Sequence, residues 1–424
     1  MTTLADCQRL DAADPLRSLR DLFSIPQDVI YLDGNSLGAL PKATADCVKQ
    51  VVTRQWGQGL IRSWNDAGWF TLPQRLGNKI APLIGAKMDE VVVTDSTSIN
   101  LFKALSAALN CAHEDTPKRR RVLSERANFP TDLYIAETMC KAQGLELVLV
   151  EPDGIISALS DQVAILLLTH VNYRTGAMHD MAKVTAAAHA VGALTIWDLA
   201  HSAGAVPVDL HAAEADFAIG CGYKYLNGGP GAPAFVWVHP QHVGRFCQPL
   251  SGWWGHDAPF EFIPHYRPAP GIGRFLCGTQ PILSLAALEC GLDVFDAAEA
   301  LGGMAALRSK SLALTDLFIE LIEQNCTGFG LGLATPREPA ARGSQVCLTH
   351  DSGAYAMVQA LIARGVMGDF RAGDGGLNKD ILRFGMTPLY IGFEDIWRAV
   401  EHLRQVLSLG EWSRPEFNQK QTVT

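Results

Sequence analysis

The chain has 424 residues, 48% of them hydrophobic and 19% charged, and a formal net charge of −9. A single hydrophobic core stops growing near ~250 to 300 residues, so we expect a large domain and a smaller one. The acidic balance disfavours nucleic acid as a partner, and the absence of a signal peptide or a long apolar run predicts a cytoplasmic protein without a membrane span.

Short apolar runs alternate with helical patterns from about residue 88 onward. The apolar runs occupy 90–94, 121–125, 145–150, 164–170, 193–198, 216–220 and 234–239, and helical patterns lie at 98–110, 131–144 and 181–192. Uninterrupted apolar strands separated by amphipathic helices are typical of a parallel sheet that is buried on both faces. The sequence therefore predicts an α/β domain whose mostly parallel sheet is flanked by helices.

The pattern of predicted helices and strands changes after this region. One long helical stretch, 282–324, leads to strand patterns at 344–350 and 381–386 and helix patterns at 355–365 and 394–408. These elements predict a small α+β C-terminal domain. We divide the chain into an N-terminal segment (1–60) that packs with the small domain and the active-site entrance, a large domain (61–305), a small domain (306–410) and a tail (411–424).

In open parallel sheets, ligands bind beyond the carboxyl ends of the strands, so the residues after each strand carry most of the functional signal. Thr97 and Ser98 follow the first strand and open a helix, where hydroxyls and free N–H groups form a cup for phosphate. Ordinary N-capping is the alternative. After 121–125 come Phe129, an aromatic residue that could equally be core, and Asp132, a helix cap or a ligand.

Two further strand ends carry ionisable groups. Asp198 ends 193–198 and His201 follows it, while Lys224 lies just past 216–220 and precedes a glycine-rich turn. A buried carboxylate needs a cation, for which a protonated ring nitrogen would serve; helix capping is the alternative for Asp198. A lysine that loses its proton can form a Schiff base with an aldehyde. Together with the phosphate cup and the aromatic side chain, these residues predict a pyridoxal phosphate (PLP) site.

Other kinds of site fit less well. GNSLG around Ser36 has the GxSxG form of a serine hydrolase elbow, but Pro41 delays the helix which that elbow requires. No Gly-rich nucleotide motif and no metal-ligand spacing occurs, and we predict no metal. Ten scattered cysteines without a CxxC pair are expected to be free buried thiols.

Several motifs together resemble the kynureninase family of fold-type I PLP enzymes, which share the aspartate aminotransferase architecture. They run through nearly the whole chain: YLDGNSLG, TDSTSINLF, ANFPTD, WDLAHSAGAVPVDL, GYKYLNGGPGAPAF, LSGWWGH, FLCGTQP and LRFGMTPLY. The resemblance implies hydrolytic cleavage of the Cβ–Cγ bond of L-kynurenine to anthranilate and L-alanine, in tryptophan catabolism and NAD biosynthesis. It also implies a homodimer with shared active sites.

The resemblance also implies roles for individual residues. Lys224, Tyr223 and Asp198 would be catalytic, with Tyr223 either a proton shuttle or only a phosphate ligand. The cofactor would contact Thr97, Ser98, Phe129, Asp132, Asp198, His201, Tyr223 and Lys224, and Trp253 and Thr279 of the neighbouring subunit. Arg383 would clamp the substrate's α-carboxylate, Arg371 is a second candidate, and Asn35, Ser36, Trp64 and Gly278 would line the substrate site.

Relatives of this fold supply the alternatives. Cysteine desulfurases and aminotransferases share the Asp, Lys and Arg, and a non-catalytic PLP-binding scaffold is another hypothesis. Desulfurases have a histidine directly before the lysine, where this chain has Tyr223. They also need a mobile catalytic cysteine, for which Cys326 and Cys347 are the candidates. Cys347 lies in an apolar run, which indicates a buried structural thiol. At Trp64, Gly278 and Thr279 the chain resembles the bacterial type of the family, and this resemblance implies a preference for L-kynurenine over 3-hydroxykynurenine.

Overall fold

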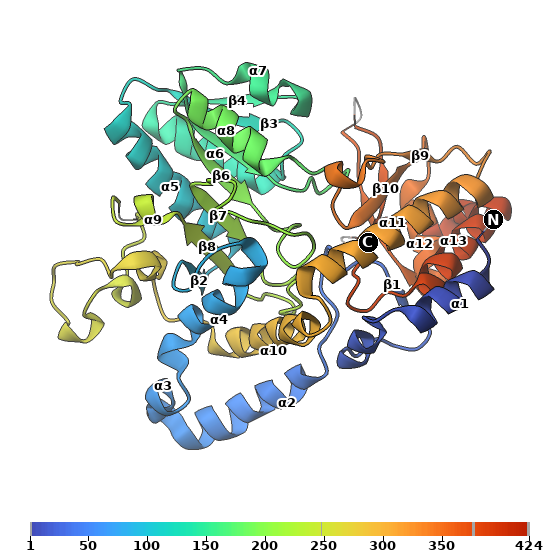
Figure 1. The fold of residues 1–424 in the computed structure, drawn as a ribbon, viewed down its shortest axis with the longest axis horizontal. Helices are drawn as coiled ribbons and strands as arrows, with labels where there is room; N and C mark the ends of the chain where they lie inside the picture. The colour runs from blue at the N-terminus through green and yellow to red at the C-terminus, as the bar shows by residue number, and fades with distance from the viewer. Residues whose placement is uncertain (1, 247, 375–377, 422–424) are drawn as a thin grey trace.

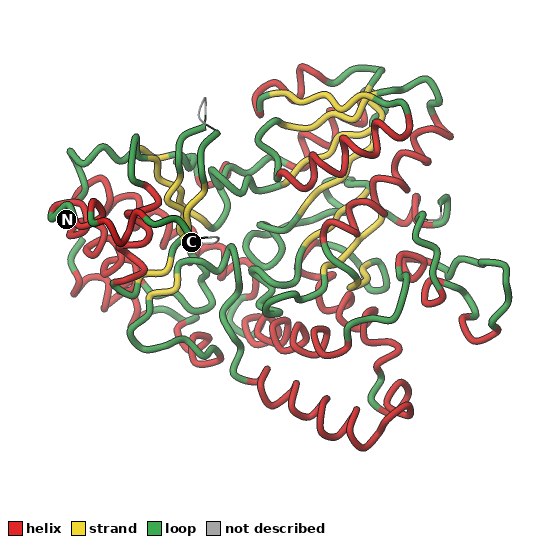
Figure 2. The backbone as a smooth tube through the Cα atoms, turned by 180° about the vertical axis from the view of Figure 1, so that it is seen from behind, coloured by secondary structure: helices red, strands yellow, loops and turns green. Residues whose placement is uncertain are grey.

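The computed structural model describes residues 2–246, 248–374 and 378–421. Figure 1 shows two lobes, a larger one built around β2–β8 and a smaller one around β9–β13, with the chain's first helix on the smaller lobe. Figure 2 shows the strands in two separate groups, with helices around each. No helix among the described residues combines the length and the apolar character needed to cross a membrane.

A seven-stranded sheet forms the centre of the larger lobe. Its spatial order is β2-β8-β7-β6-β5-β3-β4, and β8 runs antiparallel to both of its neighbours while the other pairs are parallel. The strands are β2 (Val91–Thr94), β3 (Arg121–Glu125), β4 (Glu146–Val150), β5 (Val163–Thr169), β6 (Leu194–Asp198), β7 (Phe217–Gly220) and β8 (Ala234–Val238). The predicted mostly parallel sheet is confirmed.

Helices cover both faces of this sheet because successive strand residues point to opposite sides. Val92 packs in one core cluster with α5 (Thr97–Asp115) and α6 (Pro130–Gln143). Val91 and Val93 pack in the other cluster, with α4 (Leu72–Ile80), α8 (Met181–Ala190) and α10 (Ile282–Glu299). This two-sided burial is why the strands read as continuous apolar runs.

The smaller lobe contains a four-stranded antiparallel sheet in the order β12-β13-β10-β9. Its strands are β9 (Gly332–Leu333), β10 (Gln345–Thr349), β12 (Asp369–Arg371) and β13 (Ile381–Gly385), and its helices are α11 (Gly303–Asn325), α12 (Ala354–Ala363) and α13 (Phe393–Ser408). The stretch 282–324, expected as one helical run, is two helices. Gly302 and Gly303 have φ of 102° and 57°, and this left-handed backbone interrupts the helix between α10 and α11.

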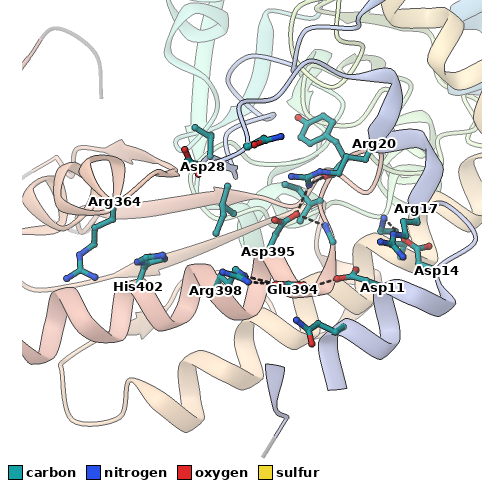
Figure 3. Close-up of a pocket in the computed structure, with 18 residues that line it drawn as sticks. Asp11, Asp14, Arg17, Arg20, Asp28, Arg364, Glu394, Asp395, Arg398 and His402 are labelled. Carbon is teal, nitrogen blue, oxygen red and sulfur yellow. Dashed lines mark hydrogen bonds and ion pairs between the residues drawn. The ribbon is translucent and has the colours of Figure 1, made fainter. Parts of the chain in front are cut away.

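The N-terminal segment packs onto the smaller lobe. Its helix α1 (Leu4–Ala13) supplies Asp11, whose carboxylate accepts hydrogen bonds from the backbone N–H groups of Phe393 and Glu394 at the start of α13. Lys310 pairs with Asp14 at 2.7 Å, and β1 (Ile30–Tyr31) pairs in parallel with β11 (Val366–Met367). Figure 3 shows the charged side chains that line a cavity of about 740 Å³ along this seam.

The last described residues also pack on the smaller lobe. Residues 411–418 form two short 3₁₀ turns, and Trp412 lies against Gly353 at the start of α12. The Tyr355 hydroxyl donates to the carbonyl of Gln419 at 3.1 Å. The division at 60, 305 and 410 stays a prediction.

Asp216 joins three elements of the larger lobe. Its buried carboxylate accepts hydrogen bonds from the N–H and hydroxyl of Thr195 in β6, and contacts His189 of α8 and His242 of α9 (Pro240–Val243), each at 2.8 Å. Burial opposes its ionisation, but the bonds from the two histidines hold the pKa of Asp216 below its ordinary value. The ionised carboxylate therefore stabilises the folded state.

The substitution Asp216→Asn should lower the free energy of unfolding by about 3 kcal/mol at neutral pH, because it leaves the surrounding donors without their anion. A carboxyl whose folded pKa is lowered stabilises above its unfolded pKa, and this contribution is lost as the pH falls, so the deficit should shrink near about pH 3. Urea denaturation of both proteins at the two pH values measures this. As control, Glu146→Gln in an exposed pair with Arg121 should cost less than about 1 kcal/mol; an equal cost for both would contradict the prediction.

Candidate active site

The carboxyl ends of β2, β3, β5, β6 and β7 meet around a cavity of about 120 Å³. Thirteen residues line it, and eight of them are residues that the sequence singled out: Thr97, Ser98, Phe129, Asp132, Asp198, His201, Tyr223 and Lys224. The remaining lining residues are Ser96, Thr131, Thr169, Tyr173 and Ala200. The sheet thus brings one set of chemically complementary side chains together from five strand ends.

One wall of the cavity is the start of α5. Ser96 caps the helix by accepting a hydrogen bond from Ile99 at 3.4 Å, and the N–H groups of the first turn have no partner within the helix. Asp95, with φ of 49°, forms the turn before it, and the buried Lys103 holds Asp95 at 2.6 Å. Free N–H groups, two hydroxyls and the positive end of a helix of 19 residues suit a phosphate group.

Two carboxyl groups of the cavity lining, those of Asp132 and Asp198, are buried. Asp198 accepts a hydrogen bond from the N–H of Ala200 at 2.8 Å, and only 3% of its surface is exposed. Burial raises the pKa of Asp198, although the positive charge of Lys224 acts against this shift. Burial and then the charge of Asp198 raise the pKa of Asp132 well above its ordinary value. Such a pair is stabilised by an additional cation, and the protonated ring nitrogen of PLP is one.

Lys224 lies between two aromatic rings. Its Nζ is 5.8 Å from the ring centroid of Phe129 and 5.6 Å from that of Tyr223. Phe129 meets Tyr173 edge to face at 5.3 Å and leaves 39% of its surface exposed, so its ring is available to a planar ligand. An amine, an aromatic face, a carboxylate pair and a phosphate cup within one cavity fit PLP.

The glycine-rich segments surround the lysine for a geometric reason. Gly38, the last residue of GNSLG, donates its N–H to the carbonyl of Tyr223 at 2.8 Å, and a Cβ on it would lie 2.3 Å from the carbonyl oxygen of Lys224. Ser36 precedes no helix, since α2 (Ala43–Gln50) begins only after Pro41. GNSLG therefore packs against the loop that contains Lys224. Because no helix follows Ser36 directly, the segment is not the nucleophile elbow of a serine hydrolase.

His201 connects the cavity to the small sheet. Its Nδ1 lies 2.9 Å from Oε1 of Gln345 in β10. Burial, followed by the charge of Lys224, lowers the pKa of His201 well below its ordinary value, so the ring is neutral.

Arg383 lies behind Tyr173. Its guanidinium is buried, donates to the Tyr173 carbonyl at 2.8 Å and contacts Ser36 at 2.8 Å, while Arg371 lies nearby with a partly exposed side chain. Asn35 is fully buried, and neither polar atom of its side chain has a partner among the described residues. The substrate candidates Arg383, Arg371, Asn35 and Ser36 thus lie together, next to the cavity.

Four further predicted residues lie outside both the cavity lining and the group around Arg383. Trp64 packs in an aromatic cluster, 5.3 Å from Trp254, and Trp253, Gly278 and Thr279 lie in the partly exposed segment near it. Trp253 and Thr279 are predicted to reach the cofactor of a neighbouring subunit, and that prediction is not tested by a single chain.

The two desulfurase candidates are buried. Burial raises the pKa of the Cys326 thiol to about 11 and that of Cys347, inside β10, to about 12. Neither lines the cavity. These are protonated, packed thiols without the exposure that a nucleophilic cysteine needs.

Sequence reasoning missed several residues. Thr169 lies at the end of strand 164–170 and Tyr173 follows it, so the strand-end rule would have found both. Asp369, which contacts Arg383, and Asp33, which lies in the same group of charges, left no such signal because their partners are distant in sequence.

Comparison with known proteins identifies the family of this chain. The family model described as "Kynureninase C-terminal domain" matches residues 307–403. A kynureninase of Burkholderia mallei is 56% identical over 427 aligned residues that cover all of both chains. A cysteine desulfurase of Thermococcus onnurineus shares the fold (TM-score 0.76, 19% identity, 92% of this chain and 98% of that one), as does a C-DES variant with glycine covalently linked to PLP (TM-score 0.79, 17% identity, 91% and 98%). At 56% identity over its full length, the chain belongs to the kynureninase family.

Proposed function

We propose that this protein uses PLP to hydrolyse the Cβ–Cγ bond of L-kynurenine, giving anthranilate and L-alanine. The observation that carries this proposal is the joint lining of one cavity by Lys224 and the Asp132–Asp198 pair, in a chain that belongs to the kynureninase family. Tryptophan catabolism, with its link to NAD biosynthesis, is the pathway context, and the cytoplasm the compartment.

The cofactor would be held by groups of this chain. Thr97 and Ser98, with Tyr223, would bind the phosphate, Phe129 would stack on the ring, and Asp198 would pair with the ring nitrogen beside Asp132. When bound, PLP supplies an aldehyde that bonds covalently to an amine and a ring that accepts the electron pair left at the substrate's α-carbon. Lys224 Nζ is the amine of the cavity for that bond.

Lys224 would also move protons once the substrate's amine has replaced it. Its Nζ would take the proton from the substrate's Cα and return a proton during product formation. Burial raises the pKa of Tyr223 above its ordinary value, so the phenol stays protonated and can act as a donor near Lys224. The neutral His201 adds no competing positive charge to the site.

Arg383 would bind the α-carboxylate of the substrate, with Ser36 and Asn35 beside it and Arg371 as a further contact. The unpaired amide of Asn35 supports a polar ligand here, because buried polar groups are normally hydrogen-bonded. Trp64, Gly278 and Thr279 would surround the aryl group, with L-kynurenine preferred and 3-hydroxykynurenine a weaker substrate.

A homodimer would complete the site. Large apolar side chains are exposed on two segments. The first contains Trp56 and Ile61, which are 58% and 77% exposed, and the second contains Phe262, which is 84% exposed. Trp253 and the exposed Thr279 lie on the second of these segments or close to it in sequence. A second copy that covers these side chains would bring Trp253 and Thr279 to the neighbouring cavity, as the resemblance implies.

The purified protein with PLP should release fluorescent anthranilate from L-kynurenine, and Lys224→Ala should lower kcat/KM at least about a thousandfold. The variant should also lose the absorbance of lysine-bound PLP. Lys141→Ala, which changes an exposed lysine, serves as control and should behave as the unaltered protein. If the protein binds PLP but releases no anthranilate, the proposed reaction is wrong. If Lys224→Ala is fully active, Lys224 does not have the proposed role.

The protein should sediment at twice the mass of one chain at micromolar concentration. Ile61→Asp, which puts a charge into the exposed apolar segment, should shift the population toward single chains, because burying an unpaired charge is costly. Glu137→Lys, at an exposed helix position, is the control. Sedimentation as a single chain at every concentration would contradict the shared site.

A further inference from the structure

Arg383 has a fixed partner within its own sheet. It lies on β13 directly opposite Asp369 of β12, and both residues are buried, with 1% of their surface exposed. A guanidinium in such a place is stable only when paired and hydrogen-bonded. Asp369 is therefore at least its counter-ion.

The geometry of the pair does more than balance charge. Oδ1 of Asp369 accepts from Nε of Arg383 at 2.8 Å and Oδ2 accepts from Nη2, so one edge of the guanidinium is held at two points. This arrangement fixes the rotation of the planar group as well as its position. Ser36 in turn donates to Oδ2 of Asp369 at 2.6 Å, which fixes the carboxylate.

The other end of the guanidinium lies toward the cavity. Nη1 donates to the carbonyl of Tyr173 at 2.8 Å, and Tyr173 lines the cavity of Lys224. Nε and Nη2 are taken by Asp369 and Ser36, so Nη1, which has one further N–H, is the nitrogen beside the cavity-lining Tyr173.

The charges around Arg383 leave room for one more anion. Arg371 pairs with Asp369 at 2.7 Å, and Asp33 lies in the same group. Burial, followed by repulsion from Asp369, raises the pKa of Asp33 to about 8. Burial also opposes the ionisation of Asp369, but the charge and hydrogen bonds of Arg383, together with the charge of Arg371 and the hydrogen bond from Ser36, hold the pKa of Asp369 below its ordinary value. At neutral pH two guanidiniums therefore face one carboxylate, and the excess positive charge suits a single carboxylate ligand.

We propose that Asp369 is a positioning residue that, by holding Nε and Nη2, turns Nη1 of Arg383 toward the substrate's α-carboxylate. The inference rests on the proposed function and names a residue that acts on the substrate only through Arg383. A counter-ion without this role would stabilise the fold but would not discriminate between ligands with and without a carboxylate.

The test is Asp369→Asn in the PLP-saturated enzyme. The amide keeps the size of the carboxyl but loses the charge and one acceptor, so KM for L-kynurenine should rise roughly 10- to 100-fold with kcat changed less than about threefold. The absorbance of bound PLP should be unchanged. An analogue of L-kynurenine that lacks the α-carboxylate serves as an inhibitor. Its inhibition constant should be equal in both proteins, because Arg383 does not bind it.

The matched control is Asp14→Asn, which removes the charge from the similarly buried Asp14–Lys310 pair at the seam in Figure 3. It should lower the midpoint of thermal unfolding and leave KM unchanged.

If Asp369→Asn fails to fold, Ser36→Ala should give a smaller rise in KM, again confined to ligands with a carboxylate. An unchanged KM, or equal weakening of the carboxylate-free analogue, would reduce Asp369 to a counter-ion, whereas failure of the unaltered enzyme to cleave L-kynurenine would instead refute the proposed function.

Discussion

Two buried carboxyl groups, one at the end of β6 and one in the first turn of α6, are the constraint on which the site depends. Asp198 and Asp132 are almost fully removed from water, and burial disfavours their ionisation. Lys224, at the neighbouring strand end, contributes the opposite charge. An enzyme that bonds this lysine to an aldehyde loses that compensation and must replace it, and a protonated ring nitrogen does so in the same place.

The parallel sheet makes this arrangement possible. Its strands end at one edge, so residues separated by more than 100 positions, such as Thr97 and Lys224, line the same cavity. In the proposed function the smaller lobe would contribute the substrate side of the site through β10, β12 and β13. The N-terminal segment contacts both lobes, with Ser36 on Asp369 and Gly38 on the lysine loop. The charged seam of α1 and α13 keeps that segment in position.

Much of the site could be predicted because its signal is local. Asp198 ends an apolar strand, Lys224 lies four residues past another, and Ser98 lies at the start of a helix, so periodicity and strand-end position identify them. The break between α10 and α11 was missed because two consecutive glycines in a helical pattern do not reveal whether the backbone turns left-handed. Asp369 and Asp33 were missed since their importance comes from cross-strand and loop contacts with Arg383, which no spacing in the sequence records.

The aryl and subunit contacts of Trp64, Trp253, Gly278 and Thr279 came from family resemblance alone and stay predictions. Within one chain, Trp64 packs against Trp254, and Thr279 is exposed. When a residue binds a ligand in another subunit, the structure of a single chain does not show that contact.

The central claim is that one amine, that of Lys224, bonds to PLP above the buried carboxyl pair. Reduction of the PLP-loaded protein with borohydride makes that bond permanent, and peptide mass spectrometry then locates it. The account predicts a pyridoxyl group on Lys224 in the peptide containing GYKYLNGG. A pyridoxyl group on another lysine, such as Lys103 beside the phosphate cup, or none at all, would contradict it.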